Sequence, residues 1–254
     1  MKGISSYADT GRFEEISLAS SSYSSILYDS IRDRPDFKAG LSEQAHLAAK
    51  FESEAKYSVL NGFSYISKHV NPHKKWGMLI NLSSFAKDAN LSLHRNCIYC
   101  SKAVDLNINA MVDNNYNTFY VAEKTEAGEL GEDIAAMQQY PVTADTSVST
   151  LLLSNIKQGE RAIIVVPLKK KNFSHCMNFI HHAGDGIVVD GQQNKLYNFN
   201  NNADKKIFDS LYGAASSAIK PARIYITGKA PDIRNEAWEM IEHPYFPDND
   251  WEEL

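Results

Sequence analysis

The sequence predicts an α+β domain in which helices come first and an antiparallel sheet follows. Two observations lead to this fold class. In the first part of the chain, apolar residues recur every three or four positions, as they do on the buried face of a helix. After Gly159 the pattern changes to short β-branched runs separated by turn residues, which is typical of strands.

The helices are predicted from apolar spacing and from the residues that start and stop it. The first is expected to begin at Ser42 and to stop at Asn61-Gly62, and residues 63–70 are expected to continue it beyond that break. A second runs from Cys97 to a stop at Asp113, with Asn96 as its N-cap. Two more are expected over Leu130–Gln139 and Ser147–Lys157.

The sheet is predicted from five runs, with a helix over Asp204–Ile219 before the last of them. These runs are Arg161–Leu168, Ser174–His182, Gly186–Asp190, Leu196–Phe199 and Ala222–Thr227, and an earlier short strand is expected over Thr118–Val121. The first run is apolar on both faces, as expected of a central strand. The next two are joined by a glycine-containing turn and therefore form a hairpin.

The domain organisation follows from composition and from these elements. Residues 1–40 are rich in serine and tyrosine with little periodicity, which predicts a flexible leader. Residues 41–90 are expected to be a helical N-terminal extension, and residues 91–254 the main domain. The mild net charge of -5 gives no argument for nucleic-acid binding.

The apolar runs, the N-terminal residues and the cysteines indicate where the protein is expected to work. No run approaches the ~18 apolar residues of a membrane span, and the N-terminus does not have the basic start and apolar core of a signal peptide. Three cysteines are too few for a disulfide framework, so we expect the folded protein to work in a reducing compartment. If it is exported, it leaves by a route that does not read a signal peptide.

Cys97 is the candidate nucleophile because it opens a predicted helix. There the backbone N–H groups have no helical partner, and together with the helix dipole they favour the reactive thiolate. Cys100 shares the same helical stripe and is the alternative nucleophile. It should be more buried and farther from the free N–H groups, so we prefer Cys97.

His175 and Asp190 are the candidate base and the group that orients it, because they lie near opposite ends of the predicted hairpin. They are 190 − 175 = 15 residues apart. For the two to face each other directly, the loop must be the four residues His181–Gly184. A tight Gly184-Asp185 turn would instead pair Asp190 with Phe179, ~13 Å along the strand from His175. The wider loop is therefore predicted.

These residues resemble the papain-fold toxin family described as glutamine deamidases. The resemblance is carried by Asn96-Cys97 at a helix start, His175-x-x-Asn178 at a strand start and Asp190-Gly191-Gln192 at a strand end. The Gly159–Ile164 lead-in is similar as well. The likeness covers roughly residues 90 to 200, and the order and spacing of the motifs are more specific than any one of them.

The resemblance implies a papain-like fold and a Cys-His-Asp triad that hydrolyses the side-chain amide of a glutamine in a target protein. Cys97 would be the nucleophile, His175 the base and Asp190 the orienting group, with no cofactor and no metal. Family members are toxins or translocated effectors. We therefore expect a protein substrate in the cytoplasm of a host or competitor cell, and an immunity protein or chaperone as a further partner.

Other readings of the same residues stay open. The triad would serve a cysteine protease equally well, and the domain could be a binding module on a papain-like scaffold. Cys97, Cys100, His175 and Cys176 suggest a structural zinc site, but adjacent strand residues point to opposite faces. The Cys97 N–H is one oxyanion donor. The second is unassigned: Gln192 is a candidate or a turn residue. Asn178 should face away from His175 and give structural support.

Overall fold

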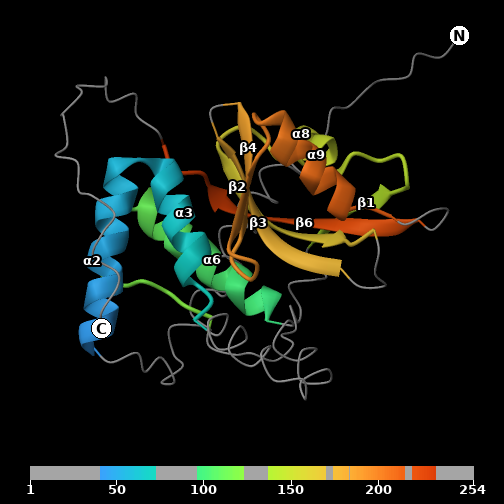
Figure 1. Cartoon of the computed structure of the whole chain (residues 1–254). Coiled ribbons are helices and arrows are strands. Elements are labelled where there is room, and N and C mark those ends of the chain that lie inside the picture. The colour runs from blue at the N-terminus through green and yellow to red at the C-terminus, as the bar shows by residue number, and fades with distance from the viewer. Residues whose placement is uncertain are drawn as a thin grey trace, which may run out of the picture.

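The computed structural model describes residues 41–72, 96–122, 137–169, 174–182, 184–214 and 219–232. Within these ranges the chain forms five helices and one six-stranded antiparallel sheet (Figure 1), which confirms the predicted α+β class. The predicted leader over residues 1–40 lies outside the described ranges, as does the predicted boundary between residues 90 and 91.

The helices within the described ranges include the two predicted around Cys97 and Ser147. They are α2 (Leu41–Tyr57), α3 (Val59–His69), α6 (Cys97–Val112), α8 (Val148–Asn155) and α9 (Asn202–Leu211). The predicted stop at Asn61-Gly62 is wrong, because the break falls at Ser58, which is extended and accepts the N–H of Asn61 as an N-cap. Gly62 continues α3, where a Cβ would lie only 3.1 Å from the backbone of Ala55, so glycine allows α2 and α3 to approach closely.

The strands confirm the predicted sheet. They are β1 (Gln138–Val142), β2 (Glu160–Pro167), β3 (Ser174–His182), β4 (Asp185–Asp190), β5 (Lys195–Asn198) and β6 (Lys220–Lys229), in the spatial order β1-β6-β2-β3-β4-β5. Strand β2 lies inside the sheet between β6 and β3, as its run of apolar residues predicts.

Three element predictions are wrong. Residues 118–121 form no strand, because both backbone polar groups of Tyr120 bond to the side chain of Asn107 on α6. Gln138 and Gln139 belong to β1, since pairing with β6 overrides their helical pattern. The helix predicted to reach Ile219 ends at Leu211, because the next residue turns extended.

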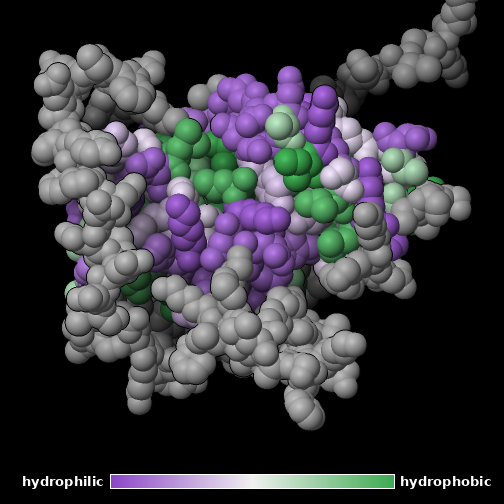
Figure 2. Space-filling model, in the orientation of Figure 1, coloured by the Kyte–Doolittle hydropathy of each residue, from purple (hydrophilic) through white to green (hydrophobic). Residues whose placement is uncertain are grey.

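The two largest hydrophobic cores lie on the two faces of the sheet, and a third, smaller cluster forms around Ile163 and Cys176. Helices α2, α3 and α6 pack in one core with Ile180, Ile187 and Val189 of the β3–β4 hairpin. Helices α8 and α9 pack in the other with Met177, Phe179 and further sheet residues. The view in Figure 1 places the two helical groups on opposite sides of the hairpin. On the part of the face in Figure 2 that is not grey, hydrophilic residues dominate and hydrophobic ones gather in separate patches.

Candidate functional site

The β3–β4 hairpin has a tighter turn than the sequence predicts. His182 pairs with Asp185, which leaves only positions 183 and 184 between the strands, so the predicted four-residue loop is wrong. His181 is paired with Gly186 and belongs to the strand as well. Gly184 has φ +86, a conformation that two-residue hairpin turns favour and that glycine adopts without strain.

This register places His175 and Asp190 as diagonal neighbours. The last paired residues are Asn178 and Val189, so Asp190 comes level with Met177, two residues beyond His175 and on the same face. Diagonal partners on one face are about 7–8 Å apart at the backbone, within reach of long side chains. The His175 Nε2 atom is 2.8 Å from Asp190 Oδ2. The contact therefore forms without the wider loop.

The His175–Asp190 pair is buried. His175 is 6% exposed and Asp190 0%. Burial acts to lower the pKa of His175, but the charge and hydrogen bond of Asp190, together with a hydrogen bond and charge from Cys97, outweigh it and raise the pKa to about 10. The second oxygen of Asp190 accepts the N–H of Gln193 at 3.0 Å, which fixes the carboxylate in the turn after β4.

Cys97 joins this pair from the start of α6. It is the first residue of the helix, it is half-buried, and its side chain lies close enough to His175 to help raise the pKa of the imidazole. Because Asp190 occupies Nε2 of the imidazole, Nδ1 is the nitrogen left for the sulfur. The three residues predicted from the sequence therefore come together, with the imidazole between the thiol and the carboxylate.

Asn96 does not cap α6, contrary to prediction. Its backbone has φ -83 and ψ 19, which is not the extended conformation of an N-cap, and it makes no side-chain cap bond. Instead its buried amide donates to Asn71 Oδ1 at 3.3 Å and accepts from Gln192 Nε2 at 3.2 Å. The first turn of α6 also carries no acidic side chain. Among the described residues, neither a side-chain cap from Asn96 nor an acidic residue of the first turn therefore lies at the positive end of α6.

The other two cysteines are buried in the protein. Burial raises the pKa of both Cys100 and Cys176, and Cys176 is hydrogen-bonded to Ser101. Both are therefore poorer nucleophiles than a half-exposed thiol. Among the described residues, no group of three or more His, Cys, Asp or Glu side chains is arranged to hold a metal ion.

Asn178 points away from His175, as alternation along β3 predicts. It is 1% exposed, and neither of its amide atoms has a hydrogen-bond partner among the described residues. Gln192, the candidate second oxyanion donor, uses its amide to bind Asn96 behind the nucleophile. Its observed contact therefore supports the position of α6.

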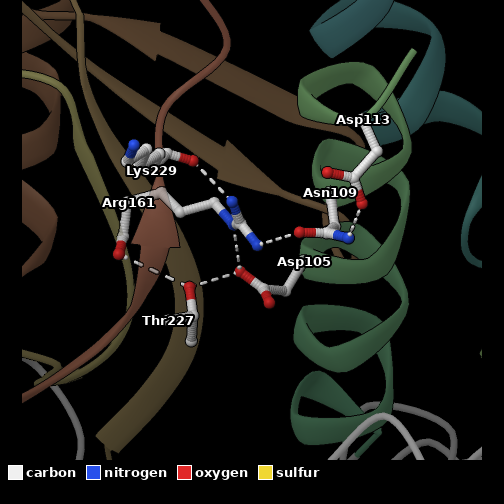
Figure 3. A network of polar contacts seen from close by, with 6 residues as sticks. All are labelled: Asp105, Asn109, Asp113, Arg161, Thr227 and Lys229. Atoms are coloured by element: carbon white, nitrogen blue, oxygen red, sulfur yellow. Dashed lines mark hydrogen bonds and ion pairs between the residues drawn. The ribbon is translucent and has the colours of Figure 1, made fainter. Parts of the chain in front are cut away.

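A buried ion pair that the sequence reasoning missed anchors α6 to the sheet (Figure 3). Asp105 Oδ1 accepts Arg161 Nε at 3.1 Å and also the Thr227 hydroxyl. Arg161 Nη2 donates to Asn109 Oδ1 at 2.8 Å and Nη1 to the Lys229 carbonyl. The network therefore joins α6 to β2 and β6. The only sign of this network in the sequence was an arginine at the start of an apolar run.

Tyr212 was also missed. Its ring stacks on the His175 imidazole, with centroids 6.0 Å apart and planes 10° apart. It lies just after α9, outside the stretch that carries the motifs.

Comparisons with known proteins leave the site to be interpreted from its own geometry. No protein-family model and no curated protein matches the chain. In the part of the chain that the structure describes, every helix is too short or too polar to cross a lipid bilayer.

Proposed function

We propose that this protein is a cysteine-dependent amidohydrolase that deamidates glutamine side chains in a target protein. The observation that carries the proposal is the position of His175. Its Nε2 contacts a fully buried Asp190 at 2.8 Å, and its remaining nitrogen faces Cys97 at the start of α6. A nucleophile, a base and an orienting acid in this relation are the parts of a catalytic triad.

A papain-like fold is the architecture that we infer for this triad. The nucleophile opens a helix that packs on an antiparallel sheet, and two strands of that sheet carry the base and the acid. The chain order of nucleophile, base and acid also agrees with the family resemblance of the motifs around Cys97, His175 and Asp190.

The charge state of His175 supports an ion-pair mechanism. With a pKa raised to about 10, the imidazole stays protonated at neutral pH. A protonated imidazole can stabilise the Cys97 thiolate and later supply a proton to a leaving group. Asp190 keeps the ring in place and stabilises its positive charge.

The reaction then follows in two balanced steps. The Cys97 thiolate adds to the carboxamide carbon, and the oxyanion is stabilised by N–H groups in the uncapped first turn of α6. His175 gives its proton to the departing ammonia, which leaves a thioester. Neutral His175 next takes a proton from water, the resulting hydroxide attacks the thioester, and glutamate is released as the Cys97 thiolate and the imidazolium return.

Delivery into another cell is part of the proposal. All three cysteines are free, which agrees with a reducing compartment, where thiols persist. We infer that the protein is secreted or translocated and acts in the cytoplasm of the target cell. A cognate immunity protein or chaperone would be a further partner.

Mass spectrometry of a treated proteome tests the proposal. A reduced lysate of candidate target cells is incubated with the wild-type protein, with Cys97→Ala or with Cys100→Ala, and glutamine-containing peptides are compared. A gain of ~1 Da at particular glutamines, present with wild type and Cys100→Ala and absent with Cys97→Ala, is the expected result. Cys97-dependent chain cleavage would point to a protease instead. Equal profiles for wild type and Cys97→Ala would refute a thiol hydrolase for these targets.

A further inference from the structure

Tyr212 approaches His175 from a third direction. The centroid of its ring lies 6.0 Å from that of the imidazole with planes only 10° apart, so the two rings are stacked with an offset. Both side chains are buried, at 4% and 6% exposure. Cys97 thus reaches the imidazole from the start of α6, and Tyr212 reaches it from the end of α9.

Backbone contacts fix where this ring lies. Tyr212 forms an isolated bridge with Leu168, and the N–H of Gly213 donates to the Pro167 carbonyl at 2.8 Å. Pro167 pairs with Ser174, the residue before His175. The end of α9 is therefore joined to the same point of the sheet from which the imidazole projects.

The hydroxyl group of Tyr212 is held too. It is hydrogen-bonded to Tyr197 of β5, and Phe208 packs between the two rings with centroid distances of 4.7 Å and 5.3 Å. Burial, with the nearby charge of Asp190, raises the pKa of both tyrosines, so both phenols stay neutral. Tyr197, Phe208 and Tyr212 form a dry aromatic cover beside the ion pair, hereafter the aromatic cover.

We propose that Tyr212 is a positioning residue: its ring excludes water from the His175–Asp190 pair and keeps the free imidazole nitrogen turned toward Cys97. The consequence for catalysis rests on the proposed function, whereas the consequence for His175 itself does not. An imidazolium that lies over an aromatic face is also stabilised by a cation–π contact. Loss of the ring should admit water and let the imidazole rotate.

Tyr212→Leu tests this inference against a matched control. Tyr65 is buried in the other core and stacks on His69 with planes 10° apart, so Tyr65→Leu removes a comparable tyrosine–histidine contact elsewhere. NMR titration of ¹³C-labelled histidine reports the His175 transition, which His175→Gln identifies. We expect Tyr212→Leu to lower the His175 pKa by roughly one unit, because loss of the cation–π contact and a weaker contact with Asp190 outweigh the relief of burial, which alone would raise it. We expect kcat to fall by about tenfold with little change in KM. Tyr65→Leu should leave both unchanged.

Two milder variants support the same test. Tyr212→Phe and Tyr197→Phe cut the same hydrogen bond, so each should shift the His175 transition slightly in the same direction, and the double variant should shift it no further. A His175 transition in Tyr212→Leu equal to that of wild type would overturn the inference. If Tyr212→Leu does not fold, an unchanged transition in both phenylalanine variants overturns it.

The titration needs no substrate, so the two proposals fail separately. A shifted His175 transition in a protein that deamidates nothing would leave the aromatic cover in place and remove only the proposed activity. If the wild-type protein is fully active but Tyr212→Leu keeps the same His175 transition and the same pH–rate profile, the proposed activity stands and the role of Tyr212 is refuted.

Discussion

Removing the carboxylate of Asp105 should cost more stability than any other single charge removal on α6. Asp105 and Arg161 are 1% and 2% exposed, so Asp105→Ala leaves the guanidinium buried without its counter-charge. Asp105 Oδ1 accepts two bonds, one of them from Arg161 Nε at 3.1 Å. At about 1.5–3 kcal/mol for each bond to a charged group, the loss is about 3–6 kcal/mol.

That magnitude agrees with the general cost of breaking a buried ion pair, about 3–5 kcal/mol. It is a large fraction of the ~5–15 kcal/mol by which domains are stable. Activity should fall as well, because Asp105 is eight residues from Cys97, about 12 Å along the helix axis, and anchors that helix to β2 and β6.

Urea unfolding followed by far-UV circular dichroism measures the effect. Asp113→Ala is the matched control, since Asp113 lies at the end of the same helix but is exposed and accepts only from Asn109. The control should change the free energy of unfolding by less than about 0.5 kcal/mol. Asp105→Ala within about 1 kcal/mol of the control would refute the reasoning.

A compensating pair separates charge from volume. Asp105→Leu and Arg161→Met should each destabilise strongly, but the double variant should recover most of the loss, because no unpaired charge stays buried. If the double variant loses the sum of the two single losses, packing rather than the ion pair holds α6.

Four further outcomes follow from the site. Cys97→Ala should abolish both activity and selective alkylation near neutral pH without changing the melting temperature. Cys100→Ala should stay active, and alkylation of Cys100 before Cys97 would contradict the assignment. Asp190→Asn should lower the His175 pKa from about 10, because the remaining burial opposes the charged ring, and an unchanged NMR titration would count against the pairing. The raised pKa of His175 means that its protonated form stabilises the folded protein; this contribution is complete below pH 6.5 and is lost as the pH rises toward 10. In denaturant titrations, the difference in unfolding free energy between wild type and His175→Ala should therefore shrink between pH 6.5 and pH 10. Gly191→Ala should cost about 1–3 kcal/mol in urea unfolding, because its Cβ would overlap two valine side chains, and a neutral effect would mean that the turn relaxes freely.

Local patterns in the sequence were enough to predict α6 and the central strands. The helix runs from Cys97 to Val112 with Asp113 after it, as its apolar stripe and stop signal indicate. Strand β2 is buried along nearly its whole length, and a continuous apolar run reports such burial directly. Elements that depend on partners far away in the sequence were harder to predict, as β1 shows, because it is a strand through its pairing with β6.

The prediction of the β3–β4 hairpin register was wrong for a different reason. The expected wide loop assumed that His175 must lie directly opposite Asp190. Side chains on one face also meet diagonally, and an imidazole with a carboxylate spans that offset to form a 2.8 Å contact. The same two residues are therefore compatible with two registers, and the sequence alone does not separate them.

The error at Asn96 shows the limit of local capping rules. An asparagine before a helix predicts a cap, yet this amide is bound by Asn71 and Gln192, which are 25 and 96 residues away. Partners at that separation cannot be read from the neighbourhood of the helix start. The result is an uncapped first turn, and that feature suits an anion-stabilising site better than the predicted cap would.

Three consecutive residues, the last of β4 and the two that follow it, link His175 to the start of α6. Asp190 binds His175, Gly191 lies so close to α6 that a Cβ would overlap Val104, and Gln192 donates to Asn96 immediately before the nucleophile. Each of the three therefore touches a different part of the site through one short turn. A shift of that turn would therefore disturb both the His175–Asp190 contact and the packing of the turn against the start of α6.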